Sequence, residues 1–301
     1  MISRVRKAII PAAGFGTRML PATKSVPKEL LPIVDRPIID YIVEEAFEAG
    51  IEHIVIVTSR MKTAIEDHFD HAFELDATLR KSGKTARAER LSRMTPAVGS
   101  ISFVRQQEAR GLGHAVWSAR QVIGDEPFAV LLPDMVMAGA ESCLKSMVRL
   151  FDEKGGNVLA VERCAPEEAH KFGIVSFRPT ADGPLVKGLV EKPAPGTAPS
   201  NFYISGRYIL QPQIFDLLAS QEPGAGGEVQ LTDALIRLMD TQEIRPFEFR
   251  GRTFDCGSPI GFVSANLSFA MARGELAPAL AGEVAAAQRN AERPDDKPAA
   301  A

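Results

Sequence analysis

The fold is set by one stretch near the N-terminus, Ala8-Ile9-Ile10-Pro11-Ala12-Ala13-Gly14-Phe15-Gly16-Thr17-Arg18. Its apolar first part predicts a short buried strand, and the glycines that follow predict a loop. Glycines in such a loop let backbone N–H groups approach a phosphate closely, and Arg18 adds a planar charged fork. The dinucleotide-binding pattern would need glycine at position 19, where Met19 stands, and a P-loop sequence is absent. The stretch therefore predicts a phosphate-binding loop of another kind.

A helix and a second strand are expected after this loop. Asp35 is the expected helix cap and Pro37 lies in the first turn; apolar residues at helical spacing continue to Phe47, and Gly50 ends the pattern. Residues 54–57 form a continuous β-branched run, which is typical of a strand buried on both faces. Strand, loop, helix and strand in this order predict a parallel βαβ unit and an α/β fold.

The rest of the chain predicts further strands and helices in two different arrangements. Ile65, Phe69 and Phe73 predict an apolar stripe on one further helix. Strands alternate with helices as far as the middle of the chain, at 101–104, 128–132 and 158–161, with a helix around 144–151. Short polar connections then predict antiparallel pairing of strands 174–177, 185–190 and 202–210. Helices are expected again at 213–219, 229–239 and 259–271.

These elements are expected to form a single domain over residues 1–280. Residues 74–100 predict a polar, basic helical excursion, either a solvated segment or a surface for a partner. The Ala-, Pro- and charge-rich residues 281–301 predict a flexible tail.

Composition excludes several classes of protein. The chain has 301 residues and a formal net charge of -3, so its overall charge does not favour nucleic-acid binding. Its three cysteines are widely spaced and lie in no CxxC pattern, which argues against a disulfide framework or a zinc cluster. The first apolar run stops at Gly14 and is too short for a membrane span or a signal peptide. We therefore expect a cytoplasmic protein with no membrane partner.

Two further charged side chains are candidates for the phosphate site. Lys28 lies ten residues after Arg18 between Pro27 and Pro32, and such a loop can fold its ammonium back onto the same phosphates. Asp134 ends an apolar strand, at the sheet edge where open α/β folds bind ligands. A carboxylate there suits Mg²⁺, which takes a few carboxylates together with phosphate oxygens.

The opening stretch, continued by Met19-Leu20-Pro21-Ala22-Thr23-Lys24 and Pro27-Lys28-Glu29, resembles the signature of bacterial UTP–glucose-1-phosphate uridylyltransferases, which are sugar-nucleotide pyrophosphorylases. Other segments resemble the family in the same order and extend the resemblance over Ala8 to about Asn266. They are Val104-Arg105-Gln106, Gly111-Leu112-Gly113-His114-Ala115, Leu132-Pro133-Asp134, Phe172-Gly173, Val190-Glu191-Lys192-Pro193, Gly206-Arg207-Tyr208, Gly227-Glu228-Val229-Gln230-Leu231-Thr232-Asp233 and Asp255-Cys256-Gly257.

The resemblance implies roles for individual residues. The nucleotide would meet the loop and a base pocket made by Ala12, Ala13, Gly14, Gly16, Thr17, Gln106, Gly111 and Gly113. The sugar would lie against Gly173, Glu191 and Gly206. The catalytic charges would be Arg18, Lys28 and Lys192, and the Mg²⁺ ligands would be Asp134 and Asp255.

Each implied role has a structural alternative. Asp134 as a turn residue and Asp255 as a helix cap are the alternatives to metal binding. An ion pair between Glu191 and Lys192 is disfavoured, because neighbouring strand residues point to opposite faces. His114 is interpreted as a packing residue, and Thr232 or Asp233 as a helix cap.

The resemblance implies a Rossmann-like nucleotidyltransferase (GT-A-like) fold with a mixed, mostly parallel sheet and a smaller antiparallel excursion over the sugar. It also implies Mg²⁺-dependent conversion of UTP and glucose 1-phosphate to UDP-glucose and pyrophosphate, for which we expect direct in-line displacement, and a homo-oligomer, often a tetramer. Three alternatives stay open. They are a dTTP-using relative, a non-catalytic nucleotide-sugar-binding subunit and a glycosyltransferase, although the last would more often carry an Asp-x-Asp motif.

Overall fold

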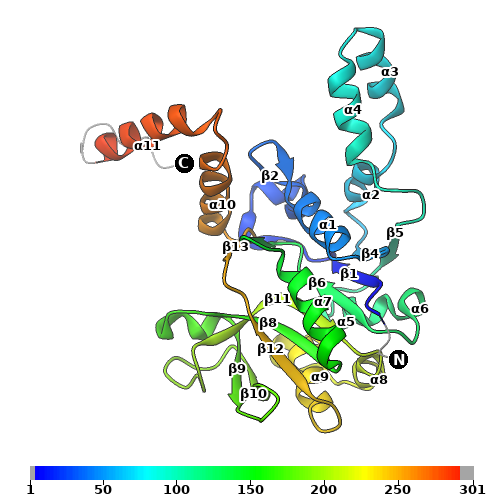
Figure 1. The fold of residues 1–301 in the computed structure, drawn as a ribbon, viewed down its shortest axis with the longest axis vertical. Helices are drawn as coiled ribbons and strands as arrows, with labels where there is room; N and C mark the ends of the chain where they lie inside the picture. Colours follow the sequence, from blue (N-terminus) through cyan, green and yellow to red (C-terminus); the bar gives the residue numbers. More distant parts are fainter. Residues whose placement is uncertain (1–3, 292–301) are drawn as a thin grey trace.

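A computed structural model describes residues 4–291 of the chain (Figure 1). The strands are β1 (Lys7–Pro11), β2 (Pro32–Ile33), β3 (Arg36–Pro37), β4 (His53–Thr58), β5 (Ile101–Arg105), β6 (Phe128–Leu131), β7 (Met135–Ala138), β8 (Asn157–Arg163), β9 (Gly173–Arg178), β10 (Leu185–Glu191), β11 (Phe202–Leu210), β12 (Ile244–Glu248) and β13 (Arg252–Asp255). The helices are α1 (Ile38–Glu48), α2 (Thr63–Phe69), α3 (Phe73–Lys81), α4 (Thr85–Met94), α5 (Leu112–Ser118), α6 (Arg120–Ile123), α7 (Cys143–Lys154), α8 (Ile214–Ala219), α9 (Leu231–Leu238), α10 (Pro259–Met271) and α11 (Ala277–Ala291).

One large mixed sheet organises the molecule, in the order β10-β9-β11-β6-β1-β4-β5, with β8 pairing both β11 and β12. The strands from β6 to β5 are parallel, as the βαβ pattern predicts. Strand β11 runs antiparallel to β6, β8 and β9, and β9 is antiparallel to β10. The predicted α/β fold with an antiparallel second half is therefore confirmed.

Helices cover both faces of the sheet, and successive side chains of β1 pack against opposite layers. In β1, Ile10 packs with α1 and α7 residues in one core cluster, and Ile9 packs with α5, α8 and α9 residues in the other. Both isoleucines are fully buried, because alternate side chains of a strand point to opposite faces. The continuous apolar runs of β1, β4 and β6 follow from this double burial.

Two sequence expectations about the helices that follow β1 and β4 are wrong. Helix α1 begins after Pro37 without a side-chain cap, and Asp35 instead bonds Arg90 and Arg273 at 3.0 and 2.5 Å. These two guanidinium groups offer the Asp35 carboxylate charged donors, and they lower its pKa. Phe73 does not continue the stripe of Ile65 and Phe69, because α2 ends first and Phe73 opens α3 with 76% of its surface exposed.

The C-terminal region continues in a helix. The predicted flexible tail, 281–301, is helical as far as Ala291, because its alanine-rich composition favours helix; residues 292–301 lie outside those described. The predicted polar excursion forms the α3–α4 hairpin, which extends away from the sheet (Figure 1). Over residues 4–291, no helix combines the length and the hydropathy needed to cross a bilayer.

Candidate active site

The sheet brings the predicted phosphate loop and Asp134 together at the carboxyl ends of its parallel strands. Strands β1 and β6 are parallel neighbours, so the chain leaves both at the same end. A cavity of about 400 Å³ opens there. Its walls include seven residues predicted from the sequence, which are Ala13, Gly14, Thr17, Lys28, Gln106, Gly111 and Asp134. The predicted site is therefore assembled from segments more than a hundred residues apart.

Four charged side chains form a chain of contacts at this cavity. The Lys28 Nζ lies 2.5 Å from the Asp134 Oδ2, and the Arg18 Nη2 lies 3.8 Å from the same oxygen. The Arg18 Nη1 also donates to the Asp255 Oδ2 at 2.9 Å. All four are residues predicted from the sequence, and the structure places two cations and two anions alternately.

Burial and charge act against each other on the pKa values in this group. Burial raises the pKa of the Asp134 carboxyl, but Lys28, Arg18 and a backbone hydrogen bond together outweigh this effect and leave the Asp134 pKa below its ordinary value. Burial likewise lowers the pKa of Lys28, and the neighbouring carboxylates outweigh it, so the Lys28 pKa is raised. Both groups are therefore charged at neutral pH.

Asp255 reaches this group through a strand pair that sequence reasoning missed. Strands β7 and β13 are antiparallel, with Asp255 opposite Met135, and the Cys256 N–H donates to the Asp134 carbonyl at 2.8 Å. Gly257 completes the approach, since a Cβ there would lie 2.6 Å from the Asp134 Oδ2 and 2.7 Å from the Arg18 Nη2. Gly257 is thus a site residue by close approach, and Ser258 rather than Asp255 caps α10.

The carboxylates present fit Mg²⁺ better than a transition metal. No group of three or more His, Cys, Asp and Glu side chains is gathered for a metal within residues 4–291. The nearby Cys256 thiol stays protonated, because burial raises its pKa to about 12. Two carboxylates, with the remaining positions left to water and phosphate, are the usual protein share of a magnesium site.

Gln106 lines the same cavity, and its side chain contacts His114. The Gln106 Nε2 donates to the Gly111 carbonyl at 3.0 Å and lies 3.1 Å from the His114 Nδ1. Both amide hydrogens are engaged if His114 accepts, and the Gln106 Oε1 is then left as an acceptor. Burial lowers the pKa of His114, which keeps the ring neutral and able to accept. His114 therefore has a polar contact that the packing interpretation did not include.

Three of the predicted nucleotide residues, Ala12, Gly16 and Gly113, are not on the cavity wall and have structural contacts instead. The Ala12 N–H donates to the Val57 carbonyl at 2.8 Å, which extends the β1–β4 pairing. The Gly113 N–H donates to the Val229 carbonyl at 2.8 Å, and a Cβ at Gly113 would lie 2.8 Å from that oxygen. Gly16 has a φ of 68° and turns the loop beside Lys28, so glycine is favoured there.

The predicted sugar residues divide between two places. Glu191 and Gly173 are paired across β10 and β9, and the Glu191 Oε2 accepts from the Thr232 hydroxyl at 2.8 Å. Helix α9 begins at Leu231 with Gln230 as its N-cap, so Thr232 and Asp233 both lie inside its first turn and the predicted capping role is wrong. Gly206 instead lies against Met135, where a Cβ would be 2.9 Å from the Met135 Cγ, and it supports the turn that carries Asp134.

Lys192 does not point to the opposite face from Glu191, as neighbouring residues of a strand would. It follows the end of β10 with a φ of 45°, so the alternation of a strand does not extend to it. Its Nζ consequently lies 3.9 Å from the Glu191 Oε1, the ion pair that strand geometry disfavoured. The Lys192 side chain is 64% exposed, and such a contact contributes little to stability. It leaves the ammonium free to contact a phosphate.

A buried ion pair beside Lys28 was also missed. The Lys62 Nζ donates to both carboxylate oxygens of Glu29 at 2.8 Å, and the Glu29 side chain is completely buried. Burial raises the pKa of Glu29 and lowers the pKa of Lys62. The pair anchors the segment that presents Lys28. Lys62 lies in a polar loop with no pattern of its own, so its partner was not predictable.

Comparison with known proteins agrees with this geometry. A family model described as "Nucleotidyl transferase" matches residues 7–271. A UTP–glucose-1-phosphate uridylyltransferase of Bacillus subtilis is 49% identical over 277 residues, which are 91% of this chain and 94% of that protein. The chain belongs to the nucleotidyl transferase family, among the UTP–glucose-1-phosphate uridylyltransferases.

Solved structures of this family share the fold. A UTP-bound UDP-glucose pyrophosphorylase from Acinetobacter baumannii superposes with a TM-score of 0.85 at 38% identity, over 93% of this chain and 99% of that one. A UDP-glucose pyrophosphorylase complexed with UDP-glucose has a TM-score of 0.81 at 40% identity, over 89% of this chain and all of that one. The mixed sheet and the loop after β1 are therefore those of a uridylyltransferase fold.

Proposed function

We propose that the protein transfers UMP from UTP to glucose 1-phosphate, giving UDP-glucose and pyrophosphate. The observation that carries the proposal is the alternating group Lys28, Asp134, Arg18 and Asp255 at the edge of the cavity. Anionic phosphates need such cations, and the two carboxylates suit a magnesium ion. Relatives that bind UTP and UDP-glucose support the choice of substrates.

The uracil end of UTP is assigned to Gln106. An acceptor at the Gln106 Oε1 matches the N3–H of uracil, and cytosine has no hydrogen there. The backbone of Ala13 and Gly14 lines the same cavity. From Gln106 the triphosphate would extend toward Arg18 and Lys28, and Lys28 lines the same cavity.

Asp134 and Asp255 would hold Mg²⁺, which when bound supplies positive charge to the phosphate groups and orients them. The chain's own residues have separate tasks. Arg18 and Lys28 hold the triphosphate and stabilise charge as pyrophosphate leaves. Lys192 contacts the phosphate of the sugar, and Glu191 accepts hydrogen bonds from sugar hydroxyls beside Gly173.

The reaction proceeds by direct displacement. A phosphate oxygen of glucose 1-phosphate is already anionic, so it attacks the α-phosphorus of UTP without a general base. The new P–O bond forms as the bond from the α-phosphorus to the bridging oxygen breaks, and that oxygen leaves with pyrophosphate. Catalysis then rests on alignment and charge stabilisation, and no covalent enzyme intermediate is formed.

The stereochemistry at the α-phosphorus tests this mechanism. UTP carrying sulfur at one defined α position, supplied with glucose 1-phosphate, is expected to give α-thio UDP-glucose of inverted configuration. A single in-line displacement inverts the centre, and phosphorus NMR identifies the product diastereomer. Retention would mean two displacements, and would replace the direct reaction with a uridylyl-enzyme.

The Gln106–His114 contact predicts a pH dependence of UTP binding. Burial and Arg110 lower the pKa of His114 below 6.5, while Glu108 opposes them. The ring is therefore neutral at pH 7–8 and gains a proton only as pH falls through the lowered pKa. It then stops accepting from Gln106, and the loss of one hydrogen bond corresponds to an affinity lower by roughly threefold to tenfold.

Calorimetric titration with UTP between pH 5 and 8 measures this effect. Because UTP itself titrates in this range, His114→Asn serves as the control: its amide oxygen can still accept but does not titrate there. The ratio of the two dissociation constants is expected to change as pH falls through the lowered pKa of His114, which lies below the ordinary histidine value. A ratio that stays constant with pH would show that His114 does not hold the base-reading amide.

A further inference from the structure

Arg207 is a buried charge directly behind the Asp134 turn. It lies on β11 with a fully buried side chain. Its Nη1 donates to the carbonyls of Leu132 and Gly206 at 3.3 and 3.1 Å, and its Nη2 donates to the Met135 carbonyl at 2.8 Å. Leu132 and Met135 stand on either side of Pro133-Asp134. One guanidinium therefore contacts both ends of the segment that carries the carboxylate.

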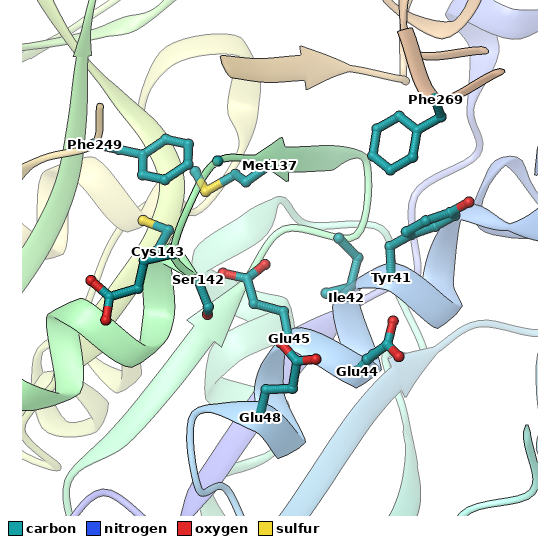
Figure 2. A pocket seen from close by; sticks show the side chains of 12 residues that line it. Tyr41, Ile42, Glu44, Glu45, Glu48, Met137, Ser142, Cys143, Phe249 and Phe269 are labelled. Carbon is teal, nitrogen blue, oxygen red and sulfur yellow. The ribbon is translucent and has the colours of Figure 1, made fainter. Parts of the chain in front are cut away.

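Glu45 holds this guanidinium in place from α1. The Arg207 Nε lies 3.2 and 3.1 Å from the two Glu45 oxygens, and the Arg207 Nη2 donates to the Glu45 Oε2 at 2.7 Å. The Glu45 Oε1 also accepts from the Leu144 N–H at 3.1 Å, in the first turn of α7. Figure 2 shows Glu45 projecting from α1 toward Ser142 and Cys143 at that end of α7. The pair thus joins β11, α1 and α7.

The same turn is fixed to the second carboxylate. The Leu132 N–H donates to the Gly206 carbonyl at 2.9 Å, and the Cys256 N–H donates to the Asp134 carbonyl at 2.8 Å. Asp255 directly precedes Cys256, so the hydrogen bond from Cys256 to Asp134 helps to fix the spacing of the two carboxylates. A shift of the Asp134 turn would disturb this hydrogen bond and with it the spacing. The position of both carboxylates therefore depends on contacts that end on Arg207.

We propose that Arg207, oriented by Glu45, is a positioning residue that sets the spacing of the Asp134 and Asp255 carboxylates for a divalent cation. The inference rests on the proposed metal role of those carboxylates. Burying an ion pair contributes little to stability compared with apolar side chains of similar volume, so stability alone does not account for its presence. Groups that orient metal ligands typically change metal affinity or activity by about 10- to 100-fold when removed.

Three variants separate positioning from folding. Arg207→Lys keeps the charge but loses the fork that spans the turn. Arg207→Met removes the charged partner of Glu45, which lies beside Glu44 and Glu48 (Figure 2) in a cavity of about 180 Å³ that Glu141 also lines. The double variant Arg207→Met with Glu45→Met removes that unpaired charge. Arg245→Lys is the matched control, because Arg245 on β12 is also nearly buried and pairs with Glu243 and Asp182.

The measurement is Mn²⁺ binding to the full-length protein, followed by electron paramagnetic resonance with UTP present and glucose 1-phosphate absent. We expect Mn²⁺ affinity to fall by about 10- to 100-fold in Arg207→Lys and in the double variant, and to stay unchanged in Arg245→Lys. Thermal unfolding should show that the double variant regains stability lost in Arg207→Met, without regaining Mn²⁺ affinity.

Two results would overturn the inference in different ways. A double variant or an Arg207→Lys variant that binds Mn²⁺ as tightly as the unaltered protein would show that the carboxylates do not need Arg207, and would leave the proposed metal role standing. Failure of the unaltered protein to bind Mn²⁺ in the presence of UTP would refute the metal role itself, and the positioning role with it.

Discussion

Replacing Asp134 by Asn is expected to lower turnover by roughly 100- to 1,000-fold, the scale on which one preorganised charge contact acts in a transition state. Asn keeps the shape of the side chain but removes the charge that lies 2.5 Å from Lys28 and 3.8 Å from Arg18. It also removes one of the two carboxylates proposed for Mg²⁺. The initial rate of pyrophosphate release at saturating UTP and glucose 1-phosphate measures the loss.

The control for Asp134→Asn is Asp182→Asn. Asp182 also pairs with a lysine, Lys154, but its side chain is 58% exposed and lies outside the cavity walls. That variant should keep its turnover. Because Asp134→Asn leaves Lys28 without its carboxylate, thermal unfolding must show that the variant is folded at the assay temperature. A folded Asp134→Asn variant with turnover within about threefold of the unaltered protein would contradict the proposed site.

Replacing Lys28 by Ala is expected to lower turnover by about 100-fold or more. The Lys28 side chain is only 16% exposed, and the Glu29–Lys62 pair anchors its segment, so its charge is presented in one orientation. That preorganisation is what makes a cation effective toward the charge that develops as pyrophosphate leaves. The loss should appear mainly in turnover and less in the KM for glucose 1-phosphate.

Lys154→Ala is the matched control for Lys28→Ala. Lys154 also pairs with an aspartate at 2.5 Å, but it lies at the end of α7 and is 36% exposed. Its replacement should leave turnover unchanged. Equal rates for the two variants would remove Lys28 from the mechanism, whereas Lys28→Arg, which restores charge with another geometry, should recover only part of the rate.

The sheet could be predicted because its signals are local. Ile54-Val55-Ile56-Val57 is apolar on both faces, and the structure buries all four side chains completely. The position of Asp134 at the end of β6 followed from the same kind of pattern. What could not be predicted is which distant segments pair. Strands β7 and β13 are short and more than a hundred residues apart, so no local signal indicated that they bring Asp255 to Asp134.

The buried charges show the same limit more strongly. Arg207 and Glu45 are 162 positions apart, and in the sequence Glu45 cannot be told from the other two glutamates of α1, Glu44 and Glu48. The expected direction of the Lys192 side chain was wrong for a different reason. Lys192 has a φ of 45°, so the alternation of strand side chains on which that expectation depended ends before it. Local composition fixed neither feature, since each depends on the tertiary fold around it.

The most direct test of the proposed function is pyrophosphate release by the purified protein with Mg²⁺ and glucose 1-phosphate, comparing UTP with dTTP, CTP, GTP and ATP. We predict release with UTP that stops when either glucose 1-phosphate or Mg²⁺ is left out, and little release with CTP, because cytosine has no N3–H for the Gln106 Oε1. A preference for dTTP would keep the mechanism and contradict the assignment of the base pocket. No release with any nucleotide, from a folded protein that still binds UDP-glucose, would contradict the proposed enzyme and indicate a non-catalytic binding subunit.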